Sequence, residues 1–442
     1  MRSPDPLATG RSFVAWAIAH GLPRQLVRGG ARKGDLISRI TIDPAVAADP
    51  YPAYDLLREQ GRVVHNGMLA ASADHAACNE ILRSEDFGTG SGHAELPSPV
   101  RRLLARATDP RAAGPVDPPS MLVVDPPDHT RYRKLVSRAF TARKVARMGD
   151  RVESVATRLL DDLAGEDGFD VVERYAGLLP VAVIADLLGV PEAEHGELLA
   201  LGNQAAATLD PALTFRQYRE VEHALRGMHD WFDGHLERLR RDPGDDLLSG
   251  LLQDPAADRL TWDELHAVGL LVLGAGFETT VNLIGNAVAL LDAHPDQLAR
   301  LQQDPGGWPN AVEEVLRVAS PVQFTMRSAL RDVEVAGVAV GGGDAVLVVL
   351  GGANRDPAVF DDPHRFDVTR ANAGENLAFS AGIHFCLGAS LARLEAATGL
   401  RLLYERFPDL RVVGPAERRR TRVLRGYERL PVAVRKPAAA TR

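Results

Sequence analysis

The sequence predicts a mainly α-helical protein that folds as a single large domain with small β-sheets. Long segments such as 142–165 and 215–241 place an apolar residue every three to four positions, with charged residues between them. Strand-like segments are short. No internal repeat, low-complexity tract or linker divides the 442 residues. We therefore expect one domain over residues 40–435, with an N-terminal extension at 1–39 and a frayed tail at 436–442.

The composition indicates a soluble globular protein, with 45% hydrophobic and 25% charged residues. The formal charge is −8, from 51 basic and 59 acidic residues, and it argues against non-specific binding to nucleic acid. Cys78 and Cys386 are the only cysteines, so the chain has no disulfide framework. We expect a reducing, cytoplasmic location.

The N-terminal extension contains an apolar stretch, "SFVAWAIAHGL". It is shorter than the roughly 20 apolar residues that a membrane-spanning helix needs. Neither a basic region before it nor a cleavage site after it indicates a secretory signal. We expect a short amphipathic helix on the protein's own surface and no membrane span. The alternative is weak membrane contact through Phe13, Trp16 and Ile18.

The longest predicted helix runs from Thr261 to His294. Thr261 and Glu264 have the spacing of a capping box, and the sequence "HP" closes the segment. Apolar residues cover nearly every side of "AVGLLVLGAGF", which predicts a buried helix.

Three other segments are irregular or extended in pattern. "VEVAGVAV", "GGGD" and "AVLVVL" predict a hairpin at 333–350. The segments 87–120 and 353–370 are rich in glycine, proline and charge, and the first is long enough to suggest a functional loop.

Within the long helix, "GAGFETT" at 274–280 is unusual for a helix centre. Each glycine there costs about 1 kcal/mol relative to alanine, and Glu278 brings a charge into an apolar environment. The small residues allow another group to approach the backbone, and Thr279 and Thr280 can bond to helix carbonyls. A crossing of two helices, with Glu278 paired to a base, is the alternative to a functional site.

The second unusual stretch is "FSAGIHFCLGASLARLE" at 379–395, which carries Cys386. The helical pattern after Cys386 predicts a helix N-terminus there, where N–H groups and the helix dipole favour a thiolate. Gly382 and Gly388 permit tight turns and the approach of a flat ligand. A zinc or iron–sulfur site lacks the further cysteines it needs. A single thiolate on a metal implies a macrocycle; an ordinary buried cysteine, as expected for Cys78, is the alternative.

This stretch resembles the heme-binding loop of the cytochrome P450 family, in which the cysteine thiolate is the proximal iron ligand. Four further motifs match in the family's order: 125–141 "DPPDHTRYRKLVSRAFT", 275–280 "AGFETT", 314–317 "EVLR" and 363–366 "PHRF". The resemblance covers roughly residues 40–435 and is greatest to soluble bacterial members. Ser380 departs from it, because many members have glycine there.

The resemblance implies heme b between the long central helix and the helix that follows the cysteine loop. Cys386 is the expected iron ligand, and His129, Arg133, Arg327 and His384 are expected to bind the propionates. The full set of expected cofactor-binding residues is His129, Arg133, Ala275, Gly276, Arg327, Phe379, Gly382, His384, Leu387 and Gly388. Glu314 and Arg317 are expected to form a buried pair joined by Arg365, with a structural role.

The implied reaction is reductive activation of O2 followed by hydroxylation or epoxidation of a lipophilic small molecule. Glu278 and Thr279 are the expected proton-delivery pair, with Glu278 linked to solvent. No flavin or iron–sulfur domain is fused to the chain, so a separate ferredoxin and its NAD(P)H-dependent reductase are the expected electron donors. The basic residues Arg131, Lys134, Arg138 and Arg393 are candidates for the docking patch, although a solvated face is an equal alternative.

The expected substrate pocket is mostly apolar. Its lining comes from the segments 87–120, 205–215, 322–325 and 422–427, and from the residues Leu273, Phe277, Val322, Phe324 and Leu424. Arg422 and Arg425 are a weaker hint of an anionic group on the substrate. Two other functions stay open: an H2O2-driven peroxygenase, which typically lacks the acid–hydroxyl pair, and a non-catalytic heme-binding sensor.

Overall fold

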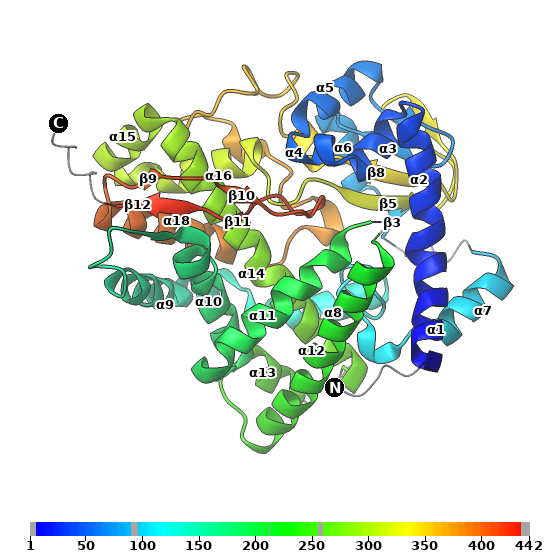
Figure 1. The fold of residues 1–442 in the computed structure, drawn as a ribbon, viewed down its shortest axis with the longest axis horizontal. Coiled ribbons are helices and arrows are strands. Elements are labelled where there is room, and N and C mark those ends of the chain that lie inside the picture. The colour runs from blue at the N-terminus through cyan, green and yellow to red at the C-terminus, as the bar shows by residue number, and fades with distance from the viewer. Residues whose placement is uncertain (1–5, 90–95, 212, 255–259, 435–442) are drawn as a thin grey trace.

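The computed structural model describes residues 6–89, 96–211, 213–254 and 260–434. The fold is helix-rich with small sheets, as expected, and the long helix α14 runs through its centre (Figure 1). The principal helices are α5 Tyr51–Gln60, α6 His75–Arg83, α7 Ser98–Ala107, α8 Asp128–Val136, α9 Ala142–Asp161, α10 Leu178–Leu188, α11 His195–Ala205, α12 Phe215–Arg241, α13 Leu247–Gln253, α14 Trp262–Ala293, α15 Pro295–Gln303, α16 Trp308–Val318, α17 Leu350–Ala353 and α18 Ala389–Arg406.

The three longest helices were predicted from their periodicity. Helix α14 begins after a complete capping box between Thr261 and Glu264, as the sequence predicts. Helix α12 has the predicted bounds, and α9 ends at Asp161, four residues before the predicted end. α14 is long and apolar enough to cross a membrane, but 78% of its most apolar window is buried inside the protein. It is therefore the core helix.

The largest sheet has five strands in the order β1-β2-β8-β5-β3. Their bounds are β1 Val64–His65, β2 Ala70–Ser72, β3 Phe87–Gly88, β5 Thr325–Ala329 and β8 Ala345–Val348. The predicted hairpin at 333–350 is wrong. The turn lies inside its first half, where Ala336 and Gly337 have positive φ and join β6 Val333–Val335 to β7 Val338–Val340. The segment "AVLV" becomes β8, paired with β2 and β5 instead.

A C-terminal hairpin covers one side of α14. It joins β10 Glu417–Arg418 to β11 Tyr427–Arg429, and its tip bridges Val322 to Leu424. Gly426 lies so close to α14 that a Cβ there would come within 2.0 Å of Asn282 Oδ1. A separate three-stranded sheet has the order β4-β12-β9, from β4 Gly168–Asp170, β9 Arg411–Val412 and β12 Pro431–Ala433.

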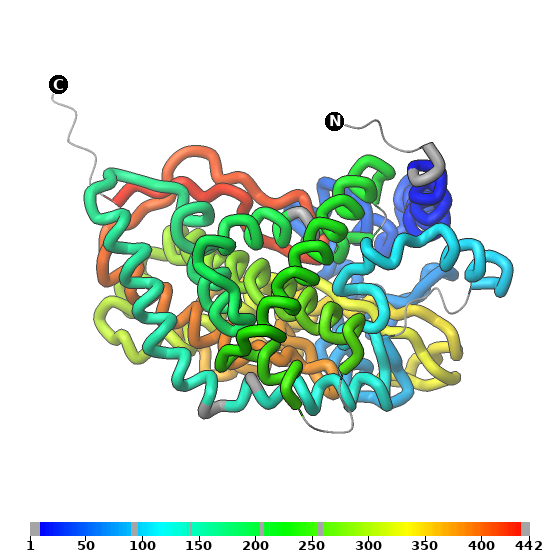
Figure 2. Tube along the Cα trace, turned by 90° about the horizontal axis from the view of Figure 1, so that it is seen from below, coloured from blue at the N-terminus to red at the C-terminus, as the bar shows by residue number. Residues whose placement is uncertain are grey.

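The N-terminal segment forms α1 Pro6–Trp16, a π-helical turn Ala17–Gly21 and α2 Leu22–Arg32. Figure 2 shows α1 and α9 at opposite ends of the molecule. Helix α1 packs on α12: the Ser12 hydroxyl donates to Glu222, and Trp16 Nε1 donates to the Leu213 carbonyl at 2.9 Å. The expected boundary at residue 39 falls inside α3 Leu36–Ile42, which is followed by α4 Pro44–Ala48.

Two other expectations concern segments that are only partly described. The segment 87–120 contains the ten-residue helix α7, so it is more helical than expected, and its residues 90–95 lie outside the described part of the chain. The expected tail, 436–442, lies outside it as well.

Candidate functional site

Cys386 lies two residues before Gly388, the N-cap of α18, as the sequence predicts. Its backbone N–H donates to the Phe379 carbonyl at 2.9 Å, which closes the loop. Burial raises the pKa of the Cys386 thiol, whereas the N–H groups of Gly388 and Ala389 and the Arg133 cation lower it. The loop thus surrounds the partly buried Cys386 with donors and positive charge, the environment that a thiolate ligand requires.

The two glycines of this loop, Gly382 and Gly388, have different surroundings. Gly382 has φ +68°, and a Cβ there would lie 2.2 Å from the Leu82 carbonyl oxygen at the end of α6. Gly382 therefore has no side chain because it packs against α6. We had expected a contact with a flat ligand to be the reason. A Cβ on Gly388 would meet no protein atom within 4 Å, so space beside the cysteine is open there.

The centre of α14 has one open face. Ala275 is exposed and Thr279, one turn later, is only partly buried, although the helix around them is buried. A Cβ on Gly274 would meet nothing within 4 Å. Thr279 Oγ1 donates to the Ala275 carbonyl at 2.9 Å. An exposed stripe at the centre of the core helix means that the protein atoms leave a void against it.

The expected contact of Gly276 with the cofactor stays a prediction; Gly276 is partly buried, and the direction of its missing side chain is toward α10. A Cβ there would come within 2.7 Å of Ile184 Cδ1, so the missing side chain makes room for α10. Leu273 and Phe277 are also fully buried. The Phe277 ring packs tightly on Gly202 of α11, because a Cβ added to Gly202 would lie 2.3 Å from the ring. Phe277 therefore packs on α11 instead of lining the expected substrate pocket, and the role of Leu273 stays a prediction.

Glu278 lies at the same level of α14 but under the C-terminal hairpin. Its side chain is 1% exposed, and Oε1 lies 2.9 Å from Arg419 Nη1. Burial raises the pKa of Glu278 and Arg419 lowers it. The expected link of Glu278 to solvent stays a prediction, and because the hairpin covers this side of the helix, the link would have to pass Arg419. The neighbouring Asn282 is buried without a hydrogen-bond partner among the described residues.

Basic side chains gather beside the cysteine loop. The His129 and His384 rings lie 4.2 Å apart, and the Arg133 guanidinium donates to the Phe385 carbonyl at 2.7 Å. Arg327 is buried on β5, and burial lowers its pKa to about 10. Burial, followed by the neighbouring His129 and Arg327, lowers the pKa of His384 to about 3.

Asp125 is the carboxylate closest to this cluster, with Oδ1 3.9 Å from His384 Nε2. His129 Nε2 is buried and has no hydrogen-bond partner among the described residues. A basic cluster with an unused buried donor fits a ligand that carries negative charge. The four expected propionate ligands, which are His129, Arg133, Arg327 and His384, are thus brought together.

The geometry fits the expected heme. The open stripe on α14 and the open space at Gly388 lie on two elements that pack together, since Leu387 contacts a cluster that contains Leu271 of α14. The basic cluster provides the charge that two propionates need. Phe379 is partly buried, and Arg393 stacks on its ring at 4.5 Å.

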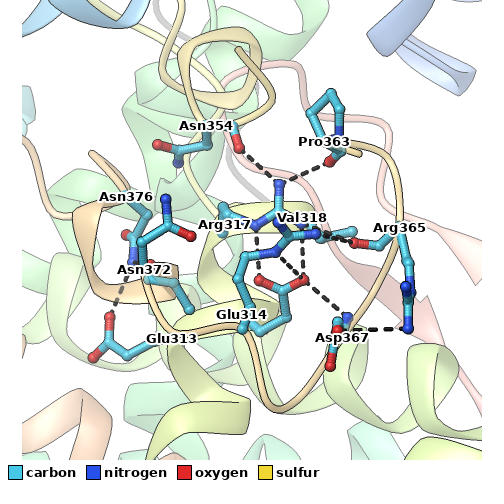
Figure 3. Close-up of polar contacts among 12 residues, drawn as sticks. Glu313, Glu314, Arg317, Val318, Asn354, Pro363, Arg365, Asp367, Asn372 and Asn376 are labelled. Carbon is cyan, nitrogen blue, oxygen red and sulfur yellow. Dashed lines mark hydrogen bonds and ion pairs between the residues drawn. The ribbon is translucent and has the colours of Figure 1, made fainter. Parts of the chain in front are cut away.

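A buried ion pair supports the segment between α17 and the cysteine loop. Arg317 donates through Nε and Nη2 to both oxygens of Glu314, at 2.7 and 2.8 Å, and both side chains are fully buried. Figure 3 shows that the Arg365 side chain points away from this pair. Only its carbonyl accepts from Arg317, while its guanidinium is 60% exposed near Asp367.

The expected role of Arg365 is therefore wrong. Arg370 is the third member of the cluster, with Nε 3.2 Å from Glu314 Oε1 and a side chain only 9% exposed. The reason is the irregular path of the chain: Arg365 turns outward, and five residues later the chain brings Arg370 back to α16.

The remaining expected pocket residues lie where the C-terminal hairpin meets β5. Val322 and Leu424 form an isolated bridge, and Leu424 is 1% exposed. Phe324 is buried and lines a small pocket under the C-terminal hairpin.

Comparison with known proteins agrees with this geometry. The sequence profile described as Cytochrome P450 matches residues 309–411. The chain is 50% identical over 424 residues to Putative cytochrome P450 140 of Mycobacterium tuberculosis, covering 95% of this chain and 97% of the relative. The chain belongs to the cytochrome P450 family.

Two further relatives of this P450 are informative. The 6-deoxyerythronolide B hydroxylase of Saccharopolyspora erythraea is 46% identical over 313 residues, which is 70% of this chain and 76% of the relative. The crystal structure of P450BioI in complex with hexadec-9Z-enoic acid ligated acyl carrier protein superposes with a TM-score of 0.82, at 32% identity, covering 88% of this chain and all of that one. Such relatives identify the protein as a P450 monooxygenase with a heme-thiolate cofactor.

The expected basic docking patch on this P450 is largely neutralised. Arg131 pairs with Glu264, Arg138 lies 2.5 Å from Asp254, and Arg393 pairs with Glu313. Of the four expected cations, only Lys134 remains exposed without a recorded carboxylate partner in the described part of the chain.

Sequence reasoning missed Arg370, Arg419 and Asp125 as partners. Arg370 and Asp125 both lie in segments that the sequence analysis names, 353–370 and 125–141. The sequence did not show that the fold brings them close to the site residues. No sequence pattern distinguished Arg419, because it is one of several arginines near residue 420.

Proposed function

We propose that this P450 binds heme b through Cys386 and hydroxylates or epoxidises a lipophilic small molecule, with two electrons from a ferredoxin and its NAD(P)H-dependent reductase. The observation that supports it best is the pairing of a partly buried, donor-surrounded Cys386 with an open stripe at Ala275 and Thr279 on the core helix. When bound, a thiolate-ligated heme supplies the reductive activation of O2. We also propose a cytoplasmic location.

The chain's own residues have distinct roles in this proposal. The basic cluster of His129, Arg133, Arg327 and His384 binds and orients the propionates. Thr279 presents a hydroxyl at the open stripe, where it holds a water or a proton. Glu278 supplies protons from beneath the C-terminal hairpin, so its route to solvent passes Arg419.

The lipophilic substrate lies against Val322, Phe324 and Leu424, which are apolar; Val322 and Leu424 form a bridge, and Phe324 is two residues from Val322. The names of relatives support a lipophilic class: one is a hydroxylase of 6-deoxyerythronolide B, and another holds an acyl group on a carrier protein. For the ferredoxin we propose the face around Lys134 and the exposed apolar residues Ile383 and Phe385 of the cysteine loop.

The experiment compares wild-type protein with Cys386→Ser after heme supplementation. We expect the wild type to give the shifted Soret band of a thiolate-ligated heme when reduced under carbon monoxide, and the variant to lose it. An unchanged band in Cys386→Ser, or a colourless wild type, refutes the assignment.

Turnover then separates the alternative functions. With a surrogate ferredoxin, its reductase, NADPH and O2, we expect product from a lipophilic test compound. Product with H2O2 but not with the reductase system indicates a peroxygenase, and no product in either indicates a sensor.

A further inference from the structure

Beneath the C-terminal hairpin lies a small pocket that faces α3 and α4. Its side chains include Arg418, Arg419, Arg422 and Arg425, and its free volume is about 20 Å³. A volume of roughly 10–15 Å³ is enough for one water molecule, so this pocket holds one small polar group. Four arginines around so small a space are an unusual concentration of charge.

Three of these arginines are fixed by neutral acceptors. Arg425 donates to two carbonyls of α4 at 2.8 and 2.9 Å, and Arg422 Nη2 donates to the Ile42 carbonyl at 3.0 Å. Arg418 donates to the Tyr427 hydroxyl at 2.8 Å and stacks on its ring. These contacts hold the guanidinium groups in place, and none of them is to a carboxylate.

One carboxylate offsets this charge at ion-pair distance, namely Glu278 on Arg419. No acidic side chain is among the described residues that line the pocket. Asp210 accepts only the backbone N–H groups of Arg422 and Val423. Burial and the neighbouring Arg425 lower the pKa of Arg418, whereas Tyr427, Tyr51 and Asp49 oppose this shift. Such a concentration of partly buried positive charge favours an anion.

Hydrogen-bond donors are also left over. The Nε atoms of Arg419 and Arg422 are buried and have no partner in the part of the chain that the structure describes. The polar side chains of the lining bond to other groups: the Tyr54 hydroxyl donates to Gln323 Oε1 at 3.2 Å, Gln323 Nε2 donates to the Ser320 carbonyl, and the Thr421 hydroxyl donates to the Leu424 carbonyl. Buried donors without partners are rare in folded proteins and indicate a missing acceptor.

The pocket adjoins the proposed substrate contacts. Phe324 is part of its lining, and Leu424 lies between Arg422 and Arg425 on the hairpin tip. A group bound among the arginines can therefore belong to a molecule whose apolar part contacts Phe324 and Leu424.

We propose that this arginine pocket binds an oxyanion, and that the oxyanion is the carboxylate of an amphipathic, lipophilic substrate. The inference rests on the proposed function and narrows its substrate class. One carboxylate oxygen fits the free volume, and guanidinium groups bind a carboxylate with paired N–H donors. A free small oxyanion such as acetate shares this chemistry, and the test distinguishes the two sources.

The test uses the heme-loaded protein and a matched pair of ligands, tetradecanoate and its methyl ester. Binding is followed by the spin-state change of the heme. We expect the acid to bind wild-type protein at least about tenfold tighter than the ester, and Arg418→Gln and Arg422→Gln to remove most of that preference. Arg420→Gln is the control, since Arg420 is exposed like Arg418 but lies outside the lining. Equal binding of acid and ester to the wild type overturns the link to substrate.

A second measurement does not depend on heme. Acetate should raise the unfolding temperature of the wild type and not that of Arg418→Gln, whose fold is checked by circular dichroism. If acetate stabilises only proteins with the intact pocket while acid and ester bind equally, the pocket binds free anions and the substrate assignment is wrong. If neither measurement distinguishes the variants, the pocket is not an anion site. Failure of the proposed function alone would instead appear as absent heme uptake, with the acetate effect intact.

Discussion

Glu278 Oε1 and Arg419 Nη1 lie 2.9 Å apart beneath the C-terminal hairpin, and this contact joins the core helix α14 to a segment about 140 residues later. The pair is buried at Glu278 and 15% exposed at Arg419. Arg419, which lies on a different element, therefore lowers the pKa of the proposed proton donor.

Replacing Arg419 should therefore destabilise the protein in a pH-dependent way. Arg419→Met leaves an unpaired carboxyl, and breaking a buried pair costs about 3–5 kcal/mol. Burial already raises the pKa of Glu278, and losing Arg419 raises it further, so the deficit is small at low pH, where the carboxyl is neutral, and grows as pH rises. Urea unfolding at pH 5 and pH 8 measures it. The double variant Arg419→Met/Glu278→Gln should recover stability at pH 8; no recovery contradicts the pairing.

Removing the Thr279 hydroxyl should uncouple electron use from product. Thr279 lies on the open stripe of α14, and its only recorded hydrogen bond is to the Ala275 carbonyl, so Thr279→Ala should fold and bind heme normally. We expect reducing equivalents to be released as peroxide. The ratio of product to NADPH consumed measures this, with Thr279→Ser as the variant that keeps the hydroxyl. Unchanged coupling in Thr279→Ala rules out the proposed role.

Glu395 should make stability fall as pH rises. Its side chain on α18 is 1% exposed, and burial raises its pKa well above the ordinary value, although a hydrogen bond from Thr280 opposes this. The unfolded chain releases this proton near pH 4.3, so above that pH stability is lost at up to about 1.4 kcal/mol per pH unit until the folded group ionises.

Glu395→Gln removes this dependence. The variant should be no more stable than wild type near pH 4 and more stable at pH 8, as measured by denaturant unfolding. Glu405→Gln on the same helix, where the side chain is 51% exposed, is the matched control and should leave the slope unchanged. A parallel pH dependence in Glu395→Gln and wild type would show that Glu395 does not cause it.

Arg370 and Arg365 should differ sharply when each is replaced by methionine. Arg370→Met removes a charged hydrogen bond to the buried Glu314, which contributes about 1.5–3 kcal/mol. Arg365→Met removes an exposed contact with Asp367 that contributes at most about 1 kcal/mol. Unfolding midpoints in urea compare them. A larger loss in Arg365→Met would restore the role expected from the sequence.

Two substitutions in the cysteine loop should have opposite effects. Ser380 has φ +62°, a conformation that costs a non-glycine residue about 1–2 kcal/mol, so Ser380→Gly should stabilise the protein and keep the thiolate spectrum. Gly382→Ala should destabilise it, because the new Cβ would lie 2.2 Å from the Leu82 carbonyl oxygen. Thermal unfolding of the heme-loaded forms tests both, and a stable Gly382→Ala variant contradicts the packing argument.

The core helix, its capping box and the position of Cys386 before α18 were predictable because they depend on local periodicity, capping and short motifs. The same holds for the pairing of Glu314 with Arg317, since residues three apart share a helix face. The hairpin at 333–350 was wrong, because Ala336–Gly337 and the segment "GGGD" are both acceptable turns and only pairing with β2 and β5 decides between them.

The sequence by itself determined which chemistry the protein carries: a lone cysteine before a helix, small residues and an acid at the centre of a buried helix, and basic residues in between. Only the tertiary structure decided the partners. It brought Arg419 to Glu278, chose Arg370 over Arg365, and turned Gly276 and Phe277 toward α10 and α11. The physical reason is that a side chain's local preferences set its backbone conformation, whereas contacts between distant segments depend on how whole elements pack.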